Sequence, residues 1–163
     1  MKALFPAAVV ILAGCAVSSS DVEITEIAPS ELPSTVMAAI SAERGDFTVV
    51  EVLKKVRDGR IYYDVEGVIS DGSELEFDVL LDGESARVVE TQRDLVWADV
   101  PADVRTLALE VSGGVEPVRI IESLQTDGAI IYELFAAGQP GDPAFEIGAR
   151  DGAIELLDER WMH

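Results

Sequence analysis

Residues 74–79 alternate strictly between acidic and apolar side chains, in the order Glu-Leu-Glu-Phe-Asp-Val. In an extended strand successive side chains point to opposite faces, so the apolar residues share one face, and Glu74, Glu76 and Asp78 share the other. This pattern is typical of an antiparallel strand with one buried face. We expect a helix to cover the apolar side, and we interpret the three acids as a solvated face.

Similar β-rich runs occur along the chain and are punctuated by Asp-Gly pairs. Such a pair is the strongest short-range hairpin signal, because both central residues of a type I′ turn need a positive φ. Two helices are indicated by a proline near the start and a glycine at the end, Pro33 and Gly45 for the first, Pro101 and Gly113 for the second. The predicted strands cover residues 47–57, 60–69, 74–81, 85–91, 115–126, 129–136, 143–149 and 153–160.

The chain repeats this arrangement once, at a period of about 68 residues. The segment 32–36 (Leu-Pro-Ser-Thr-Val) lines up with 100–104 (Val-Pro-Ala-Asp-Val). The segment 58–65 lines up with 127–134, and both read Asp-Gly-x-Ile-x-Tyr followed by Asp or Glu. Agreement in order, spacing and chemical type indicates an internal duplication.

The duplication predicts the fold class and the domain boundaries. We expect an α+β fold of two repeats, residues 30–95 and 96–163, each one helix followed by a four-stranded antiparallel sheet. Two packed modules and one continuous sheet both fit this pattern.

Over residues 29–160 the chain resembles the PepSY-like superfamily, which includes the β-lactamase-inhibitor-like lipoproteins of bacterial envelopes. The resemblance rests on the Leu-Pro or Val-Pro helix start, the repeated Asp-Gly-x-Ile-x-Tyr-Asp/Glu strand, and the later Asp-Gly hairpin followed by Glu90 or Glu159. It implies tandem helix-and-sheet modules in the periplasm or at the cell surface, with some relatives proposed or known to bind and inhibit secreted enzymes. It implies no catalytic residues, and this chain lacks the paired cysteines of the known β-lactamase inhibitor proteins.

The amino terminus has the anatomy of an export signal. Lys2 is followed by an apolar run over residues 3–12, which is too short for a stable transmembrane helix. Leu12–Cys15 resembles the lipobox of bacterial lipoprotein precursors. The resemblance implies removal of a signal peptide, residues 1–14, and anchoring in the lipid bilayer through an acylated Cys15. The alternative is an ordinary secretory signal or an uncleaved anchor with a chance cysteine.

Residues 15–29 follow as a lipidated tether. Ala16 is not an aspartate, and by resemblance to the enterobacterial sorting pattern this favours the outer membrane, facing the periplasm. The segment is rich in serine and acidic residues, which indicates a flexible linker. Its apolar residues, Val22, Ile24 and Ile27, leave a short added strand as the alternative.

The composition restricts the partners. The chain has 31 Asp and Glu against 12 Lys and Arg, and its formal net charge is −19. Nucleic acid is therefore a very poor partner, and membrane affinity has to come from the lipid rather than from a basic patch. Basic proteins and divalent cations are the electrostatically sensible ligands. The alternative is that the acidity mainly maintains solubility.

The sequence predicts no catalytic residue, cofactor or metal site. The only histidine is His163, so a histidine-based triad or zinc cluster has no basis, and an acylated Cys15 is no nucleophile. Neither a P-loop nor a G-x-G-x-x-G fingerprint is present, and no loop has the Asp-x-Asp-x-Asp-Gly spacing of a calcium site. We therefore expect a protein that is not an enzyme.

Four residues are candidates for partner binding. Trp97 lies in the connector between the repeats and Trp161 follows the last predicted strand, where large rings anchor a partner or close a core. Lys54 and Lys55 begin the one local basic group in this acidic chain. That group is either a solvated turn or a patch that steers a partner.

These observations predict a membrane-anchored periplasmic lipoprotein that acts as a non-enzymatic protein-binding or inhibitor-like module. Its open sheets would present an edge or an acidic face to another envelope protein. The alternative is a structural or cation-binding acidic envelope lipoprotein with no specific partner.

Overall fold

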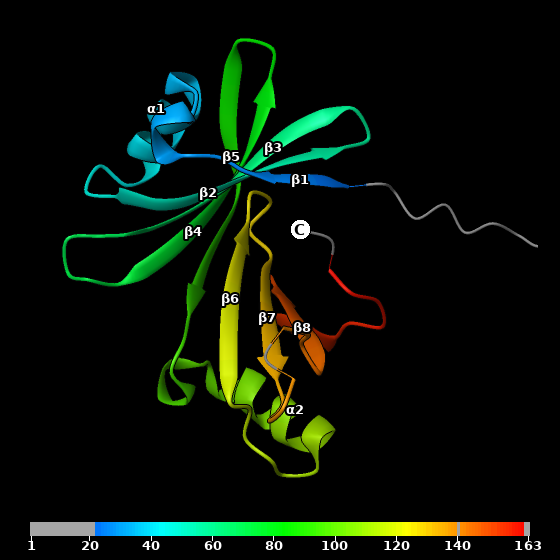
Figure 1. The fold of residues 1–163 in the computed structure, drawn as a ribbon. Coiled ribbons are helices and arrows are strands. Elements are labelled where there is room, and N and C mark those ends of the chain that lie inside the picture. Colours follow the sequence, from blue (N-terminus) through cyan, green and yellow to red (C-terminus); the bar gives the residue numbers. More distant parts are fainter. Residues whose placement is uncertain (1–21, 140, 162–163) are drawn as a thin grey trace, which may run out of the picture.

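The computed structural model describes residues 22–139 and 141–161, and this part of the chain forms one antiparallel sheet of nine strands. Each strand pairs with the next one in the sequence, so the sheet is a meander from β1 to β9 (Figure 1). Two helices, α1 (Ser34–Glu43) and α2 (Ala102–Ser112), follow the short 3-10 helices η1 (Pro29–Glu31) and η2 (Trp97–Asp99). The strands are β1 (Glu23–Glu26), β2 (Thr48–Arg57), β3 (Arg60–Val68), β4 (Glu74–Asp82), β5 (Ser85–Asp94), β6 (Arg119–Gln125), β7 (Ile130–Phe135), β8 (Phe145–Arg150) and β9 (Ala153–Leu156).

The prediction of two repeats, each with its own four-stranded sheet, is wrong. β5 and β6 pair directly, from Glu90 opposite Gln125 to Asp94 opposite Ile121, and this pairing joins all the strands into one sheet. Side-chain alternation reports which face of a strand is buried, but it does not report which strand lies along each backbone edge. Pairing β5 with β6 satisfies backbone groups that two separate sheets would leave unpaired at their edges.

The segment before η1 adds a strand at the edge of this sheet. β1 pairs antiparallel with β2, and Ile24 lies opposite Lys55. Of the two interpretations of this segment, the added strand is confirmed for Glu23–Glu26. The predicted signal peptide, Cys15 and the rest of the tether up to residue 21 lie outside the described residues.

Both helices cover the same face of the sheet, each over its own apolar cluster. α1 contributes Val36 and Ile40 to the first cluster, and α2 contributes Val104 and Ala108 to the second. The strand residues of the first cluster are Val52, Tyr63, Val65, Phe77 and Val79, and those of the second are Ile120, Tyr132, Leu134 and Ile147.

The Asp-Gly pairs lie in the turns between neighbouring strands. Asp58-Gly59 and Asp151-Gly152 have positive φ at both residues, as a type I′ hairpin requires. These two hairpins fix the register of β2 with β3 and of β8 with β9, and the register decides which side chains face away from the helices.

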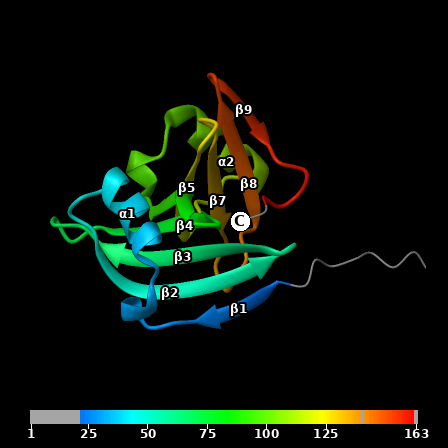
Figure 2. The same cartoon turned by 90° about the horizontal axis from the view of Figure 1, so that it is seen from above.

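The opposite face of the sheet, which we call the polar face, carries every buried polar side chain of the described residues. Each of them alternates with core residues along its strand and so points away from α1 and α2. Figures 1 and 2 show that the sheet is strongly twisted, so that β1–β3 and β8–β9 run in different directions. The buried polar residues are Asp64, Asp78, Glu90, Ser123, Glu133 and Glu146.

Candidate functional site

Two pairs of buried acids face each other across strands of the polar face. Asp64 of β3 lies opposite Asp78 of β4, and Glu133 of β7 lies opposite Glu146 of β8. All four residues are at most 7% exposed. Asp64 and Glu133 are the acids of the repeated Asp-Gly-x-Ile-x-Tyr-Asp/Glu motif. The first acid pair, Asp64 and Asp78, and the second acid pair, Glu133 and Glu146, therefore occupy equivalent places in the two halves.

The first acid pair has an excess of negative charge. Lys55 of β2 forms an ion pair with Oδ2 of Asp64. Oδ1 of Asp78 is buried and accepts no hydrogen bond from the described part of the chain. Burial and the negative charge of Asp64 raise the pKa of Asp78 from 3.8 to about 7, although Lys55 and Arg57 partly offset this effect. A cation or an N–H donor that reaches Asp78 would therefore be strongly bound.

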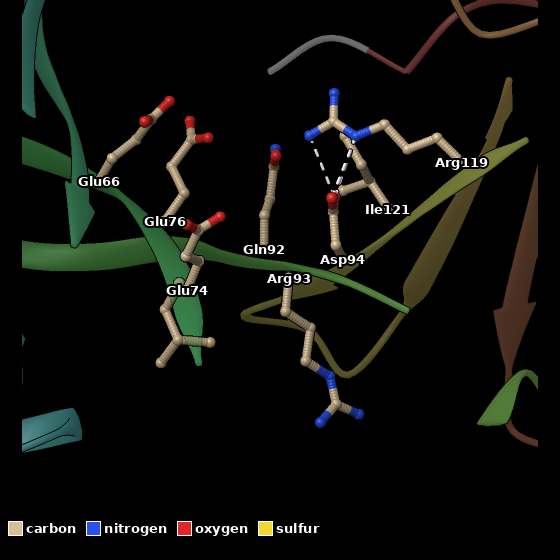
Figure 3. Close-up of a pocket in the computed structure, with 9 residues that line it drawn as sticks. Glu66, Glu74, Glu76, Gln92, Arg93, Asp94, Arg119 and Ile121 are labelled. Atoms are coloured by element: carbon tan, nitrogen blue, oxygen red, sulfur yellow. Dashed lines mark hydrogen bonds and ion pairs between the residues drawn. The ribbon is translucent and has the colours of Figure 1, made fainter. Parts of the chain in front are cut away.

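A shallow hollow lies beside the first acid pair, where the two halves of the sheet meet (Figure 3). Glu66, Glu74 and Glu76 line it from β3 and β4. On the far side Arg119 is already paired, because its Nε donates to both carboxylate oxygens of Asp94 at 3.1 and 3.2 Å. Acids therefore dominate the charge of this hollow.

Two acids of the hollow have raised pKa values. Burial and neighbouring carboxylates raise the pKa of Glu76 from 4.5 to about 7, and the same causes raise the pKa of Glu66. Figure 3 shows both side chains pointing to the side on which Gln92 and Arg119 lie, whereas Arg93 points away. Both side chains are thus positioned to meet a cationic group that enters from this side.

A hydrogen-bond network occupies the joint between the two halves. The hydroxyl of Ser123 donates to Oε1 of Glu90, and Nε2 of Gln92 donates to the same oxygen at 2.9 Å. Nε2 of Gln125 donates to Oγ of Ser123 at 2.7 Å. Glu90 is thus held by partners on β5 and β6, and the network fixes these strands to each other.

The chain's own C-terminal segment, residues 157–161, folds back over the second acid pair. The backbone N–H of Leu157 donates to the carbonyl oxygen of Glu146 at 3.0 Å, and the N–H of Trp161 donates to its Oε2 at 2.6 Å. The guanidinium of Arg160 lies 3.4 Å from Oε1 of Glu146 and also binds the Pro143 carbonyl. An arginine and a backbone N–H thus already bind Glu146, one acid of the second acid pair.

We expect Arg160→Gln to lower the free energy of unfolding by about 1 kcal/mol, because it removes a charge-assisted bond from a buried carboxylate. Arg150→Gln is the matched control, since its ion pair with Asp127 joins two side chains that are 52% and 55% exposed. That pair should contribute less than about 0.5 kcal/mol. Urea unfolding measures both effects, and hydrogen exchange at Trp161 should accelerate only in Arg160→Gln. Equal effects of the two variants would contradict the role given to Arg160.

The two tryptophans lie on different sides of the sheet. Trp97 lies in η2 and packs against the apolar cluster under α2. Trp161 is partly buried over the polar face, next to Gly148 and Leu157. The structure therefore does not bring the two rings together, and only Trp161 belongs to the face that carries the acids.

The two lysines also point to different faces, because they are neighbours in β2. Lys54 lies opposite the buried Tyr63, on the side of the helices, whereas Lys55 binds Asp64 on the polar face. Arg57 also lies on the polar face, with its guanidinium 5.0 Å from the centre of the Tyr62 ring. Of the two predicted lysines, only Lys55 belongs to the candidate site.

The interpretation of Glu74, Glu76 and Asp78 as a solvated face is wrong for two of these residues. Glu74 is exposed, but Glu76 is partly buried and Asp78 is 7% exposed. β4 is an interior strand, so side chains of β3 and β5 flank its polar residues on both sides.

Sequence reasoning also missed the other buried acids of the polar face. The signal for Asp64 and Glu133 was present, since each follows the tyrosine of the repeated motif and so points away from the core. Glu90 and Glu146 gave no comparable signal, because their burial depends on Ser123 and on the returning C-terminal segment.

No protein-family model matches the chain, and no curated protein sequence matches it.

Within residues 22–139 and 141–161, no helix is both long and apolar enough to cross a bilayer. In the same part of the chain, no three His, Cys, Asp or Glu side chains are grouped so that they could hold a metal ion. The chemistry of the polar face is that of buried carboxylates, which bind ammonium, guanidinium and N–H groups.

Proposed function

We propose that this protein is a non-enzymatic binding module of the bacterial envelope, and that its polar face docks on a lysine- and arginine-rich surface of a partner protein. The observation that carries the proposal is the set of acids that the fold gathers on the face away from α1 and α2. Helices cover the other face, so a partner would approach the polar face, where Glu66 and Glu74 are exposed at the hollow.

Charge complementarity supports a basic partner. The chain carries a net charge of −19, and the hollow at the joint of the two halves is lined by Glu66, Glu74 and Glu76. Such a field attracts a basic surface and speeds its association. Burial first, and then the charges of Asp64 and Glu66, raise the pKa of Glu76, and a bound cation would offset the repulsion between these acids.

The anchoring part of the proposal rests on the sequence. Leu12–Cys15 has the lipobox pattern, and an acylated Cys15 would hold the sheet at a membrane, with the outer membrane favoured by Ala16. Anchoring at a membrane raises the effective concentration of any partner in the same compartment.

The test is site-specific photo-crosslinking in the bacterium that makes the protein. A photoreactive amino acid is placed at Glu74, on the rim of the hollow, or at Glu110, an exposed position of α2. We expect one protein adduct at Glu74 and none at Glu110. Glu66→Lys should reduce the adduct at least about tenfold, which corresponds to 1.4 kcal/mol, because it reverses a charge of the hollow.

Glu116→Lys is the matched control, since it makes the same charge change at an exposed position away from the hollow, and it should leave the adduct unchanged. An adduct that forms equally from Glu110, or one that Glu66→Lys leaves intact, would contradict the proposal. Either result would favour a structural acidic lipoprotein without a specific partner.

A further inference from the structure

The two acid pairs are built alike but are covered differently. In each half the acid after the motif tyrosine lies opposite an acid of the next strand, on the polar face. In the second half, Glu146 receives the N–H of Trp161 and the guanidinium of Arg160. The chain itself thus shows what one acid of such a pair binds, namely an arginine and a backbone N–H of the C-terminal segment.

At the first acid pair the equivalent acid is Asp78. It is 7% exposed, and its Oδ1 accepts no hydrogen bond from any described residue. A buried carboxylate oxygen without a donor is energetically unfavourable, so a ligand that supplies the donor gains affinity. This difference between the two halves points to a ligand at Asp78.

Side chains at the edge of the sheet surround Asp78. A small hollow beside its side chain is lined by Val22, Lys55, Arg57 and Tyr62. Val22 is 40% exposed and immediately precedes the edge strand β1, and the two basic side chains are long. Rearrangement of these side chains would open a path to Asp78 without any change in the sheet.

The chemistry favours arginine as the ligand. A guanidinium is planar and carries five N–H donors, so it can bind two facing carboxylates at once, whereas an ammonium acts as a point charge. Lys55 already binds Asp64, and Arg57 lies over the Tyr62 ring. The neighbouring acids Glu66 and Glu76 add further negative charge on the same face.

We propose that the first acid pair binds an arginine side chain on an extended segment of the partner protein, in the way that Glu146 binds Arg160. This inference rests on the proposed function and specifies the residue that the partner inserts.

The test uses the purified full-length chain and calorimetry at pH 8 in physiological salt. The probe is a short peptide of alternating threonine and arginine, and its control peptide carries citrulline, a neutral isostere, in place of arginine. We expect the arginine peptide to bind at least about tenfold more tightly than the citrulline peptide. Asp78→Asn should weaken binding of the arginine peptide by about the same factor.

Asp82→Asn is the matched control, because it makes the same change at an exposed position and removes one charge from the same strand. It should leave binding unchanged, because Asp82 does not belong to the first acid pair. General attraction to an acidic protein would instead make the two variants weaken binding equally. Equal binding by Asp78→Asn and the unchanged chain would overturn the proposal. Binding of only a peptide with the sequence of residues 157–161 would also overturn it and indicate a second copy of this chain.

Failure of this inference is distinguishable from failure of the proposed function. If Glu66→Lys reduces the crosslinked adduct while Asp78→Asn leaves peptide binding unchanged, the polar face is a docking surface and the arginine site is wrong. If the adduct at Glu74 is absent and the arginine peptide still discriminates Asp78→Asn from Asp82→Asn, the arginine site stands and the broader docking surface is wrong.

Discussion

Replacing Gly67 by alanine is expected to lower the free energy of unfolding by about 3 kcal/mol, because the fold leaves no room for a Cβ atom at this position. That atom would lie 2.3 Å from the carbonyl oxygen of Thr48 and 2.5 Å from Cζ of Phe47. The Phe47 ring is buried and makes an edge contact with Phe77, at 5.0 Å between the ring centres. Neither the backbone of β2 nor this ring can move without disturbing the first apolar cluster.

Gly45→Ala is the control for this substitution. The nearest contact of its added Cβ is the carbonyl oxygen of Ser41 at 3.8 Å, and the residue is exposed. It should change the free energy of unfolding by less than about 1 kcal/mol. Chemical denaturation of both variants measures the difference. A Gly67→Ala variant as stable as Gly45→Ala would show that the Phe47 ring moves aside, contrary to the packing described above.

The sequence pattern predicted eight of the nine strands, because strand burial is a local property, but the predicted strands 115–126 and 153–160 were too long, since β6 is Arg119–Gln125 and β9 is Ala153–Leu156. The alternation around Phe77 and Val79 placed both side chains toward a helix, and both lie in the core that α1 covers. The repeat around Tyr63 and Tyr132 likewise predicted two equivalent strands with buried rings. These features depend only on residues two positions apart along one strand.

The pairing of β5 with β6 was not predictable in the same way. It joins Glu90 to Gln125 across a connection that contains η2 and α2, and alternation within either strand is the same whether or not they pair. The burial of Asp78 has a different origin, because it depends on the side chains of the flanking strands β3 and β5, which alternation within β4 does not report. The most informative acids of the candidate site therefore looked like ordinary surface residues in the sequence.

Asp78→Asn is expected to stabilise the protein by about 2 kcal/mol more at pH 8 than at pH 5. The pKa of Asp78 is raised from 3.8 to about 7 in the folded state, first by burial and then by the charge of Asp64. Between these two values the folded state binds the proton and the unfolded state does not. The contribution of Asp78 to stability therefore falls as the pH rises from about 4 to about 7, and the full cost of its charge is present at pH 8. Asparagine has a similar shape and carries no charge, so it removes this cost.

Thermal unfolding at pH 5 and pH 8 measures the effect, and a gain of about 2 kcal/mol corresponds to roughly 5 °C in Tm for a chain of this size. Asp82→Asn again serves as the control, because the net charge of −19 makes any removal of an acid slightly favourable at high pH. It should shift Tm by less than about 2 °C at either pH, since the residue is exposed. If Asp78→Asn lowers Tm at pH 8, the carboxylate is stabilised by partners that the folded chain supplies, and the reason for an external arginine disappears. If it raises Tm more at pH 8 than at pH 5, the protein retains at Asp78 a buried charge that destabilises its own fold, as expected for a group that a partner neutralises.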